Sequence, residues 1–424
     1  MRAPAIMSAA MPWLTAPGPR FAWPEALARV AHAASLVCLH SAAGDTILAV
    51  EPEVRRLTAW DEVAQLVSEP QPGPALPTTP GWHPHGPGWA LQLDYEFPRH
   101  AGVAWRLDGY ARWTAEGLCT LQASDDVGLT RLAGRLAGPA RACPAPVLTT
   151  ALTPTWTAAE HGARVERIRA WIAAGDIYQA NLTLPISGRL AASAHPDLGL
   201  FLAMTSQSPA PYAALLRAPG RPSVISNSPE CFLRQRGPQV WSEPIKGTRR
   251  RVPAADGETR AALLASVKDR AELAMIIDLV RNDLGRVAVP GSIRVEADAT
   301  VMDLPYVHHL VARVGARLRP ETGFVDALRA AFPAGSITGA PKLRAMQIIA
   351  ALEAGPRGAY CGTFGWIGAD HADLAVAIRI LTIAKDTVRL HAGGGIVADS
   401  QGAAEWDEVR AKTTAMAAAL GGAL

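Results

Sequence analysis

The sequence predicts a globular protein of the mixed α/β (α+β) class. Short apolar runs of strand length, bounded by glycine and proline, are interspersed with longer stretches whose apolar residues recur at helical spacing. Of the 424 residues, 49% are hydrophobic and 19% are charged, a composition typical of a folded protein with a large core. A chain of this length has room for two or three domains of ordinary size.

Strands dominate the expected structure of the first third of the chain. Apolar and β-branched residues predict them at residues 35–40, 46–50, 89–95 and 103–107. Residues 68–88 are rich in proline and glycine, which predicts a loop. Several prolines between residues 132 and 154 then favour a boundary. The predicted organisation is an N-terminal region over residues 1–150 and a second, chemistry-bearing domain over residues 155–420.

Helices and strands alternate in the second part. The expected helices are one that stops at Gly175, a long one over residues 258–284, and one that begins within residues 336–342 and buries Leu343, Met346, Ile349 and Ala350. The expected strands cover residues 176–183, 307–311, 358–365 and 374–381. In the first of these strands Gln179, Asn181 and Thr183 share one face, which could contact solvent or line a site.

Charge and cysteine usage exclude several classes of protein. Lys+Arg 41 against Asp+Glu 38 give a net charge of +3, which is too balanced for nucleic acid as the main partner. The five cysteines form no CxxC pair and no metal spacing, which fits a reducing compartment. No stretch predicts a signal peptide, a membrane span, a dinucleotide motif or a P-loop. We therefore expect a cytoplasmic protein with no membrane or nucleic-acid partner.

The turn over residues 244–251 carries a lysine, a glycine and three arginines behind a strand-like run. Pro244 fixes its own φ and Gly247 permits a sharp bend, so the turn would hold the amine of Lys246 in a defined place. Such a basic turn could also be a solvated surface loop. Glu230, further upstream, lies beside an apolar run. An apolar flank would raise the pKa of its carboxyl and suit a general acid, unless this is an ordinary surface glutamate.

Acidic residues recur at helical spacing in two places. Asp269 and Glu272 lie three residues apart, as do Glu405 and Glu408, with Lys412 four residues further on. Carboxylates that share a helix face in this way can bind a cation, or they can form solvated ion pairs.

Three further positions in the second part need an explanation. Arg379 lies within an apolar run, so it requires an acidic partner or the carboxylate of a substrate. Three glycines at residues 393–395 would let backbone amides approach an anion. His308 and His309 are consecutive in a predicted strand and face opposite ways, so one of them should point inward.

Taken together, nine motifs resemble, in order, those of the chorismate-utilising enzyme family. They are GDIYQANLT (175–183), SPECF (228–232), PIKGTRRR (244–251), KDRAELAMIIDLVRNDLGRVA (268–288), GSITGAPKLRAM (335–346), RGAYCGTFG (357–365), AIRIL (377–381), GGGIVADS (393–400) and EWDEVRAK (405–412). The resemblance runs from about residue 160 to the C-terminus and is weaker before it, at residues 39–41 and 86–95. It implies two facing antiparallel-rich sheets with helices on the outside, chorismate as the substrate and Mg²⁺ as the cofactor.

The resemblance also implies a role for each matching position. Glu272 and Glu408 match metal-binding glutamates, with Asp269 and Glu405 close by, and such oxygen ligands suit Mg²⁺. The positions that match substrate-binding residues are Tyr360 and Arg379 for the enolpyruvyl carboxylate, and Thr338, Gly393, Gly394, Gly395 and Lys412 for the ring carboxylate.

Two positions discriminate among members of the family. Members that add water at C2 of chorismate carry a lysine where this chain has Gln179. In this chain the resemblance implies that Gln179 binds the substrate. Members that add ammonia at C2 carry alanine where this chain has Lys246. A lysine there resembles the branch that aminates C4. Its amine would add at C2 while Glu230 helps the 4-hydroxyl to leave, His309 would be the active-site histidine, and ammonia would then attack C4.

Two alternatives remain open: amination at C2, and a catalytically silent chorismate-binding subunit. The chain contains no recognisable glutaminase motif, because no cysteine lies in a glycine-rich nucleophile elbow. Ammonia is therefore expected to come from a separate glutamine amidotransferase subunit, and no fused lyase is expected after Lys412.

Overall fold

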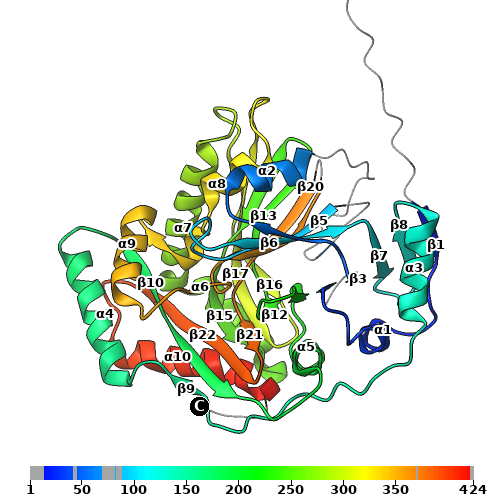
Figure 1. Cartoon of the computed structure of the whole chain (residues 1–424). Helices are drawn as coiled ribbons and strands as arrows, with labels where there is room; N and C mark the ends of the chain where they lie inside the picture. Colours follow the sequence, from blue (N-terminus) through cyan, green and yellow to red (C-terminus); the bar gives the residue numbers. More distant parts are fainter. Residues whose placement is uncertain (1–13, 42–44, 69–81, 83–87, 369–370, 421–424) are drawn as a thin grey trace, which may run out of the picture.

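The fold, a computed structural model, is described for residues 14–41, 45–68, 82, 88–368 and 371–420. Most of the predicted loop over residues 68–88 lies outside the described residues. Two large antiparallel sheets face each other, and helices cover their outer sides (Figure 1). The predicted mixed α/β class, with two facing antiparallel-rich sheets, is therefore confirmed. In the described part of the chain, no helix combines the length and the apolar character needed to span a bilayer.

The first sheet has twelve strands. In spatial order they are β1 (Leu14–Pro17), β8 (Cys119–Ala123), β7 (Gly109–Trp113), β3 (Thr46–Val50), β2 (Leu36–His40), β11 (Tyr212–Arg217), β12 (Ser223–Ser228), β21 (Ile380–Ala384), β22 (Thr387–Ile396), β10 (Gln179–Arg189) and β18 (Gly339–Ala340), with β9 (Thr153–Pro154) beside β10.

The second sheet has ten strands. In spatial order they are β15 (Ile245–Arg250), β17 (Val307–Arg317), β14 (Gln239–Glu243), β13 (Cys231–Arg236), β20 (His371–Val376), β19 (Thr363–Ile367), β5 (Gly88–Leu93), β6 (Gly102–Leu107) and β4 (Val54–Leu57), with β16 (Arg294–Asp303) beside β17.

Two sets of helices cover the sheets. Those packed on the outer side of the first sheet are α1 (Trp23–Arg29), α3 (Asp126–Leu136), α4 (Ala158–Ala173), α5 (Pro196–Gln207), α9 (Lys342–Leu352) and α10 (Gly402–Ala417). Those packed on the second sheet are α2 (Trp60–Ser68), α6 (Asp256–Ala265), α7 (Val267–Gly285) and α8 (Phe324–Ala331). Short 3-10 turns are η1 (Pro253–Ala255), η2 (Gly335–Ile337) and η3 (Ala418–Leu420).

The alternation of side chains along a strand explains how one strand contributes to two hydrophobic clusters. In β2, Val37 and Leu39 join the cluster between the sheets, which also contains Leu91 of β5. Leu36 and Cys38 of the same strand point the other way and join the cluster under the outer helices. Because successive side chains of a strand point to opposite faces, a strand covered on both sides is apolar throughout. This is why β2 is a continuous apolar run in the sequence.

The N-terminal region and the second part share both sheets. β2 pairs with β11 in the first sheet, and β5 pairs with β19 in the second. The boundary predicted near residue 150 therefore marks a change in the sequence, while strands from both sides of it are hydrogen-bonded in the same two sheets.

The predicted helix over residues 258–284 is wrong as a single element. The chain breaks at Ser266, which adopts an extended conformation (φ −67°, ψ 106°) between α6 and α7. The Ser266 hydroxyl accepts a hydrogen bond from the backbone N–H of Asp269 at 3.3 Å. Serine side chains that cap a new helix in this way compete with continuation of the old one.

The strand predicted over residues 374–381 is also wrong as a single strand. β20 ends at Val376 and β21 begins at Ile380, and the two belong to different sheets. The chain crosses between the sheets at residues 377–379, and Arg379 there has a left-handed φ of 51°. At the crossing Ala377 is buried, whereas Ile378 and Arg379 are half-buried, and Arg379 is the one charged residue of the run.

Two other predictions were shifted. The strand predicted at residues 358–365 begins only at Thr363, after a turn. On α9, the predicted buried stripe is confirmed at Ile349 but wrong at Leu343, which is 77% exposed, and at Ala350, which is exposed. The buried face consists of Ala345, Ile348, Ile349 and Leu352. The remaining predicted strands are confirmed, as is the helix before Gly175, which has a left-handed φ of 82°.

Candidate active site

The amine of Lys246 lies on β15, the edge strand of the second sheet. Its side chain is only 13% exposed, and its Nζ is 3.9 Å from Oε2 of Glu272 on α7. Burial lowers the pKa of the Lys246 amine, although the charges of Glu272 and Glu230 act in the opposite direction. A lysine with a lowered pKa has a larger neutral, nucleophilic fraction at neutral pH.

Glu230 lies in the short connection between β12 and β13 and is 4% exposed. Its Oε1 accepts a hydrogen bond from the Ser336 hydroxyl at 2.6 Å. Burial raises the pKa of Glu230 to about 7. A carboxyl group that is partly protonated at neutral pH can donate a proton, which is the property that a general acid requires.

His309 lies on β17, directly opposite Thr248 of β15. Its Nδ1 is 3.0 Å from the Thr248 hydroxyl and 3.4 Å from the carbonyl of Gly247. Its Nε2 is buried and has no partner among the described residues. Burial and the nearby charge of Arg379 lower the pKa of His309 to about 4, so the ring is neutral at neutral pH.

Arg379 fills the crossing between the two sheets, and no acidic partner for it lies among the described residues. Burial alone lowers the pKa of its guanidinium. An unpaired guanidinium in such a place is costly unless a ligand completes it. From the sequence, the partner of Arg379 could be either an acidic residue of the protein or a carboxylate of the substrate. The structure shows no salt bridge of Arg379 with any described residue.

Tyr360 stacks on His391, with ring centroids 4.9 Å apart and an interplanar angle of 21°. Both rings are buried, and the next residue, Cys361, has a left-handed φ of 62°. Left-handed backbone at a residue other than glycine is strained and tends to occur at functional sites. Cys361 and Arg379 are both such residues, and each adjoins or carries a predicted substrate contact.

The glycine-rich end of β22 lies against β10 and α10. A Cβ at Gly393 would be 2.0 Å from the carbonyl of Leu182, and one at Gly395 would be 2.2 Å from Nε2 of Gln179. These glycines are therefore required by close packing as well as by any anion. Strand β21 pairs with β22 only as far as Leu390, so among the described strands one edge of the glycine run is open. Nε2 of Gln179 is buried, and none of the described residues bonds it.

Lys412 contacts this glycine run, and Thr338 lies on the other side of β10. Thr338 is fully buried, and its hydroxyl donates to the carbonyl of Ala334 at 3.0 Å. Lys412 donates to the carbonyl of Gly393 at 2.8 Å and lies 2.6 Å from Oε1 of Glu408. The predicted binding of a ring carboxylate by the Thr338 hydroxyl and the Lys412 amine stays a prediction.

Carboxylates from α7 and α10 form the candidate metal site. A Cβ at Gly394 would lie 3.1 Å from Oε1 of Glu408 and 3.3 Å from Oε2 of Glu405, so these two side chains share one place beside β22. Burial and the charge of Glu408 raise the pKa of Glu405. The charge of Glu272 is balanced by two lysines: Lys246, as described above, and Lys268, whose Nζ lies 4.0 Å from Oε1 of Glu272. Such a set of oxygen donors fits a hard cation.

Two observations limit this site. Asp269 is engaged elsewhere, because its carboxylate accepts from Arg249 at 2.8 Å and sits against Gly247. Within the part of the chain that the structure describes, no three acidic, histidine or cysteine side chains are already arranged as metal ligands. The metal roles of Glu272, Glu405, Glu408 and Asp269 stay predictions.

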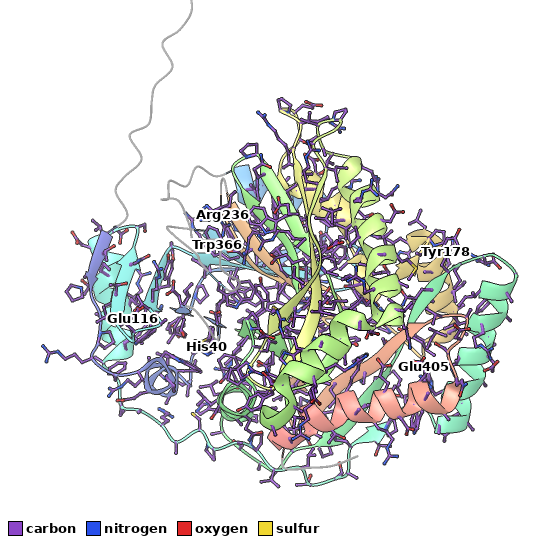
Figure 2. The ribbon with its side chains drawn as sticks, turned by 180° about the vertical axis from the view of Figure 1, so that it is seen from behind. His40, Glu116, Tyr178, Arg236, Trp366 and Glu405 are labelled. Atoms are coloured by element: carbon purple, nitrogen blue, oxygen red, sulfur yellow. The ribbon has the colours of Figure 1, made fainter. Side chains whose placement is uncertain are left out.

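The residues of the candidate site come from many elements, and sequence reasoning missed several supporting partners. Ser336, Thr248 and His391 contact Glu230, His309 and Tyr360 respectively. Ser336 and Thr248 lie inside the recognised motifs, but only folding shows what they touch. Figure 2 shows Glu405, on α10, and Tyr178, which precedes β10, toward one end of the molecule and His40 toward the other. A cavity of about 310 Å³ lies nearby, lined by residues that include Pro229, Ile245 and Val311, but neither Glu230 nor Lys246 lines it.

The fold, together with the buried acid Glu230 and the nearby amine of Lys246, is typical of an enzyme. The guanidinium of Arg379, which has no acidic partner among the described residues, suits a substrate that carries a carboxylate. A family model described as chorismate binding enzyme matches residues 37–418. The chain belongs to this family.

Solved structures of similar fold cover nearly the whole chain. MenF, the menaquinone-specific isochorismate synthase from Escherichia coli, has a TM-score of 0.79 at 19% identity, covering 96% of this chain and 94% of that one. Anthranilate synthase component I from Streptococcus pneumoniae has a TM-score of 0.72 at 22% identity, covering 98% and 94%. At these identities the likeness establishes the fold alone.

Curated relatives are closer in sequence but match over a shorter span. Aminodeoxychorismate synthase component 1 of Salmonella typhimurium is 43% identical over 265 residues, 62% of this chain and 57% of the relative. Anthranilate synthase component 1 of Streptomyces coelicolor is 43% identical over 284 residues, 66% of this chain and 55% of the relative. The chain thus matches less than two thirds of the length of these relatives.

Proposed function

We propose that this chain converts chorismate and ammonia into 4-amino-4-deoxychorismate, the reaction of an aminodeoxychorismate synthase component 1, in the route to 4-aminobenzoate. The observation that carries the proposal is the buried amine of Lys246, with its lowered pKa, in the electrostatic field of the buried acid Glu230, whose pKa is raised to about 7. A nucleophile and an acid with pKa values displaced toward neutrality are the two groups that this substitution needs.

The first step forms a bond between Nζ of Lys246 and C2 of chorismate. Both ring double bonds shift, the bond from C4 to its hydroxyl breaks, and Glu230 delivers the proton that lets the hydroxyl leave as water. In the second step ammonia forms the new bond at C4, both double bonds shift back, and the bond between C2 and Lys246 breaks. The lysine thereby blocks C2 and directs nitrogen to C4.

The two carboxylates of the substrate would be held by separate groups. The guanidinium of Arg379 and the hydroxyl of Tyr360 would bind the enolpyruvyl carboxylate, with neutral His309 beside it. Amides of the glycine run, Thr338 and Lys412 would bind the ring carboxylate, and Gln179 has an amide donor, unbonded among the described residues, for the same ligand. For Gln179 the ligand would satisfy a buried polar group that is costly to leave unpaired, and for Arg379 it would supply the acidic partner that the described residues lack.

Mg²⁺ is the proposed cofactor. Glu272 and Glu408 would hold it, with Glu405 close by, and the bound ion would supply positive charge to the ring carboxylate. Asp269 would support the site through its bond to Arg249, which holds α7 against β15. Ammonia would come from a separate glutamine amidotransferase partner.

A second candidate is the amination of C2 that anthranilate synthases perform, because a relative of that name is equally identical in sequence. Lys246 argues against it, since a lysine amine at C2 would exclude ammonia from that carbon. The test is to incubate the purified chain with chorismate, Mg²⁺ and ammonium, and to identify the product by mass and chromatography. The 4-amino product supports the proposal, whereas anthranilate or the absence of turnover refutes it.

A further inference from the structure

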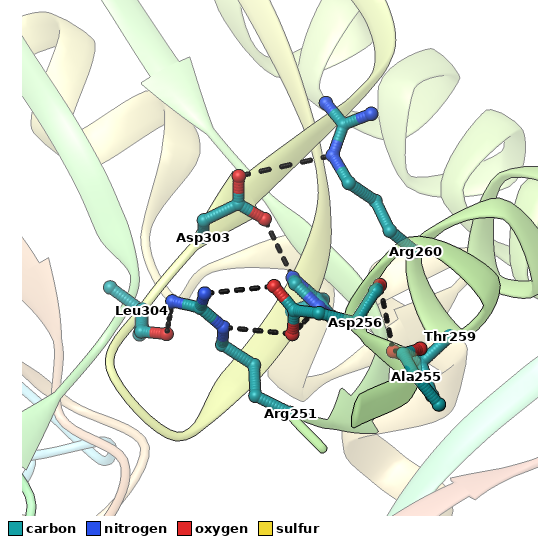
Figure 3. Close-up of polar contacts among 8 residues, drawn as sticks. Arg251, Ala255, Asp256, Thr259, Arg260, Asp303 and Leu304 are labelled. Carbon is teal, nitrogen blue, oxygen red and sulfur yellow. Dashed lines mark hydrogen bonds and ion pairs between the residues drawn. The ribbon is translucent and has the colours of Figure 1, made fainter. Parts of the chain in front are cut away.

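A second cluster of charged residues lies at the far end of strand β15 from Lys246. His308 is 1% exposed, and its Nδ1 is 2.6 Å from Oδ1 of Asp303, at the end of β16. Its Nε2 is 3.0 Å from Oδ1 of Asp256, the first residue of α6. Figure 3 shows Asp256 and Asp303 converging from a helix and a strand, with Arg251 and Arg260 around them.

Two arginines lie against the same carboxylates. Nε and Nη2 of Arg251 donate to the two oxygens of Asp256 at 3.0 and 2.8 Å, and Nη1 donates to the carbonyl of Leu304 at 3.2 Å. Nε of Arg260 lies 3.8 Å from Asp303. The bonds from Arg251 and His308 hold the pKa of Asp256 below its usual value. Both ring nitrogens of His308 thus lie within hydrogen-bond distance of an aspartate oxygen, one from Asp303 and one from Asp256.

This arrangement differs from that of the neighbouring His309. His309 faces the candidate site and keeps a ring nitrogen that no described residue bonds, whereas both nitrogens of His308 are used on the opposite face of β17. No step of the proposed reaction employs His308. Its two bonds instead join the hairpin of β16 and β17 to the start of α6, which is distant in the sequence.

Strand β15 needs such an anchor. It is an edge strand, paired among the described strands with β17, and its ladder is interrupted by a register shift at Gly247. None of its six residues is fully buried, so little apolar packing holds it in place. Its middle is tied to α7 by the bond between Arg249 and Asp269, and the residue that follows it, Arg251, belongs to the charged cluster.

We propose that His308 is a positioning residue: its ring, hydrogen-bonded on both sides between Asp303 and Asp256, fixes the end of β15 and thereby places the amine of Lys246 for reaction. The role given to Lys246 rests on the proposed function, but the mechanical claim about β15 does not. Since Arg249 lies directly opposite His308 in the ladder, a shift at this end is transmitted along a strand of only six residues to Lys246.

The main test compares wild type with His308→Gln. The glutamine amide carries its donors on one nitrogen and no charge, so it can bond only one of the two aspartates. We expect hydrogen–deuterium exchange of the β15 peptide to rise at least about tenfold while other strands keep their exchange rates. With ammonium as the nitrogen source, kcat should fall about tenfold or more while KM for chorismate stays within about twofold, because the carboxylate-binding groups are untouched.

Two further variants act as controls. His308→Lys places several hydrogen-bond donors at the same position and should recover a measurable part of both β15 protection and kcat. His40→Gln removes another hydrogen-bonded histidine, whose Nδ1 is 2.8 Å from the Thr46 hydroxyl in the first sheet. It should leave the exchange of β15 and kcat unchanged. If His308→Gln does not fold, Asp303→Asn, at a carboxylate that is 47% exposed, replaces it and should change both readouts in the same direction.

The outcomes separate the two claims. Unchanged exchange of β15 in a folded His308→Gln or Asp303→Asn variant overturns the anchor. Faster exchange with kcat within about twofold of wild type overturns the positioning of Lys246. Faster exchange in a protein whose wild type never forms the 4-amino product refutes the proposed function while the anchor itself stands.

Discussion

Replacing Glu230 with glutamine tests the acid of the proposed reaction through both stability and rate. The side chain is 4% exposed, and burial raises its pKa from the ordinary value of 4.5 to about 7. That shift corresponds to roughly 3 kcal/mol in favour of the neutral form, at about 1.4 kcal/mol per pH unit. The amide that replaces the carboxyl would be uncharged at every pH and could still accept the hydrogen bond from Ser336.

The sign of the effect on stability follows from linkage. The folded protein binds the Glu230 proton more tightly than the unfolded chain does, so this contribution is complete below pH 4.5 and is lost as pH rises through 7. Glu230→Gln removes the loss. The unfolding free energy of the variant, relative to wild type, should therefore increase by roughly 2.5 kcal/mol between about pH 5 and pH 8.5. Denaturant titrations of both proteins at the two pH values measure this difference.

The rate should respond in the opposite sense. Wild-type turnover should decline above an apparent pKa near 7, because the acid must be protonated. In Glu230→Gln that alkaline limb should disappear and the rate should fall roughly 10²–10⁴-fold. Full activity with an unchanged alkaline limb, or a stability difference that is independent of pH, would refute the reasoning.

The remaining predictions concern the other groups of the site. Lys246→Ala should reduce formation of the 4-amino product by roughly several orders of magnitude, yet leave chorismate binding intact and shift some product toward the 2-amino isomer; wild-type product at the wild-type rate would contradict this. Chelation should abolish turnover, and Glu272→Gln and Glu408→Gln should each weaken Mg²⁺ and chorismate together, as titration calorimetry can measure; full activity of either variant at low Mg²⁺ would remove that residue from the metal site. Arg379→Gln should raise KM for chorismate about 10²-fold by removing a charge-assisted bond, and an unchanged KM would exclude the clamp. The purified chain should use ammonium but not glutamine, and steady glutamine-driven turnover would argue against a separate amidotransferase.

Much of the fold was predictable because its local signals agree with its tertiary structure. β2, β3, β5 and β6 are short apolar runs bounded by turns, and each forms where the pattern predicts it. The misplaced elements have different causes. The helix predicted over residues 258–284 is broken by the cap at Ser266. Residues 374–381 are apolar except for Arg379 and continue through a change of sheet, so periodicity could not reveal the crossing.

The candidate site was predictable as a set of residue types but not as a set of contacts. The motifs singled out Glu230 and Lys246, and the structure shows that both are buried and that their pKa values are shifted toward neutrality. The engagement of Asp269 with Arg249 could not be foreseen, because it depends on the break at Ser266, which sets the start of α7. The role of His308 depends likewise on segments that only the folded chain brings together.

The sharing of both sheets by the two parts of the chain has a consequence for dissection. A fragment that began near residue 155 would lack β2 beside β11 and β5 beside β19. Each loss would expose a row of unpaired backbone N–H and C=O groups on a strand whose side chains are apolar on both faces. Open edges of that kind template pairing with other chains. The motifs of the candidate site therefore lie in a part of the sequence that we do not expect to remain soluble as a separate fragment. The N-terminal strands cover the strand edges that such a fragment would expose.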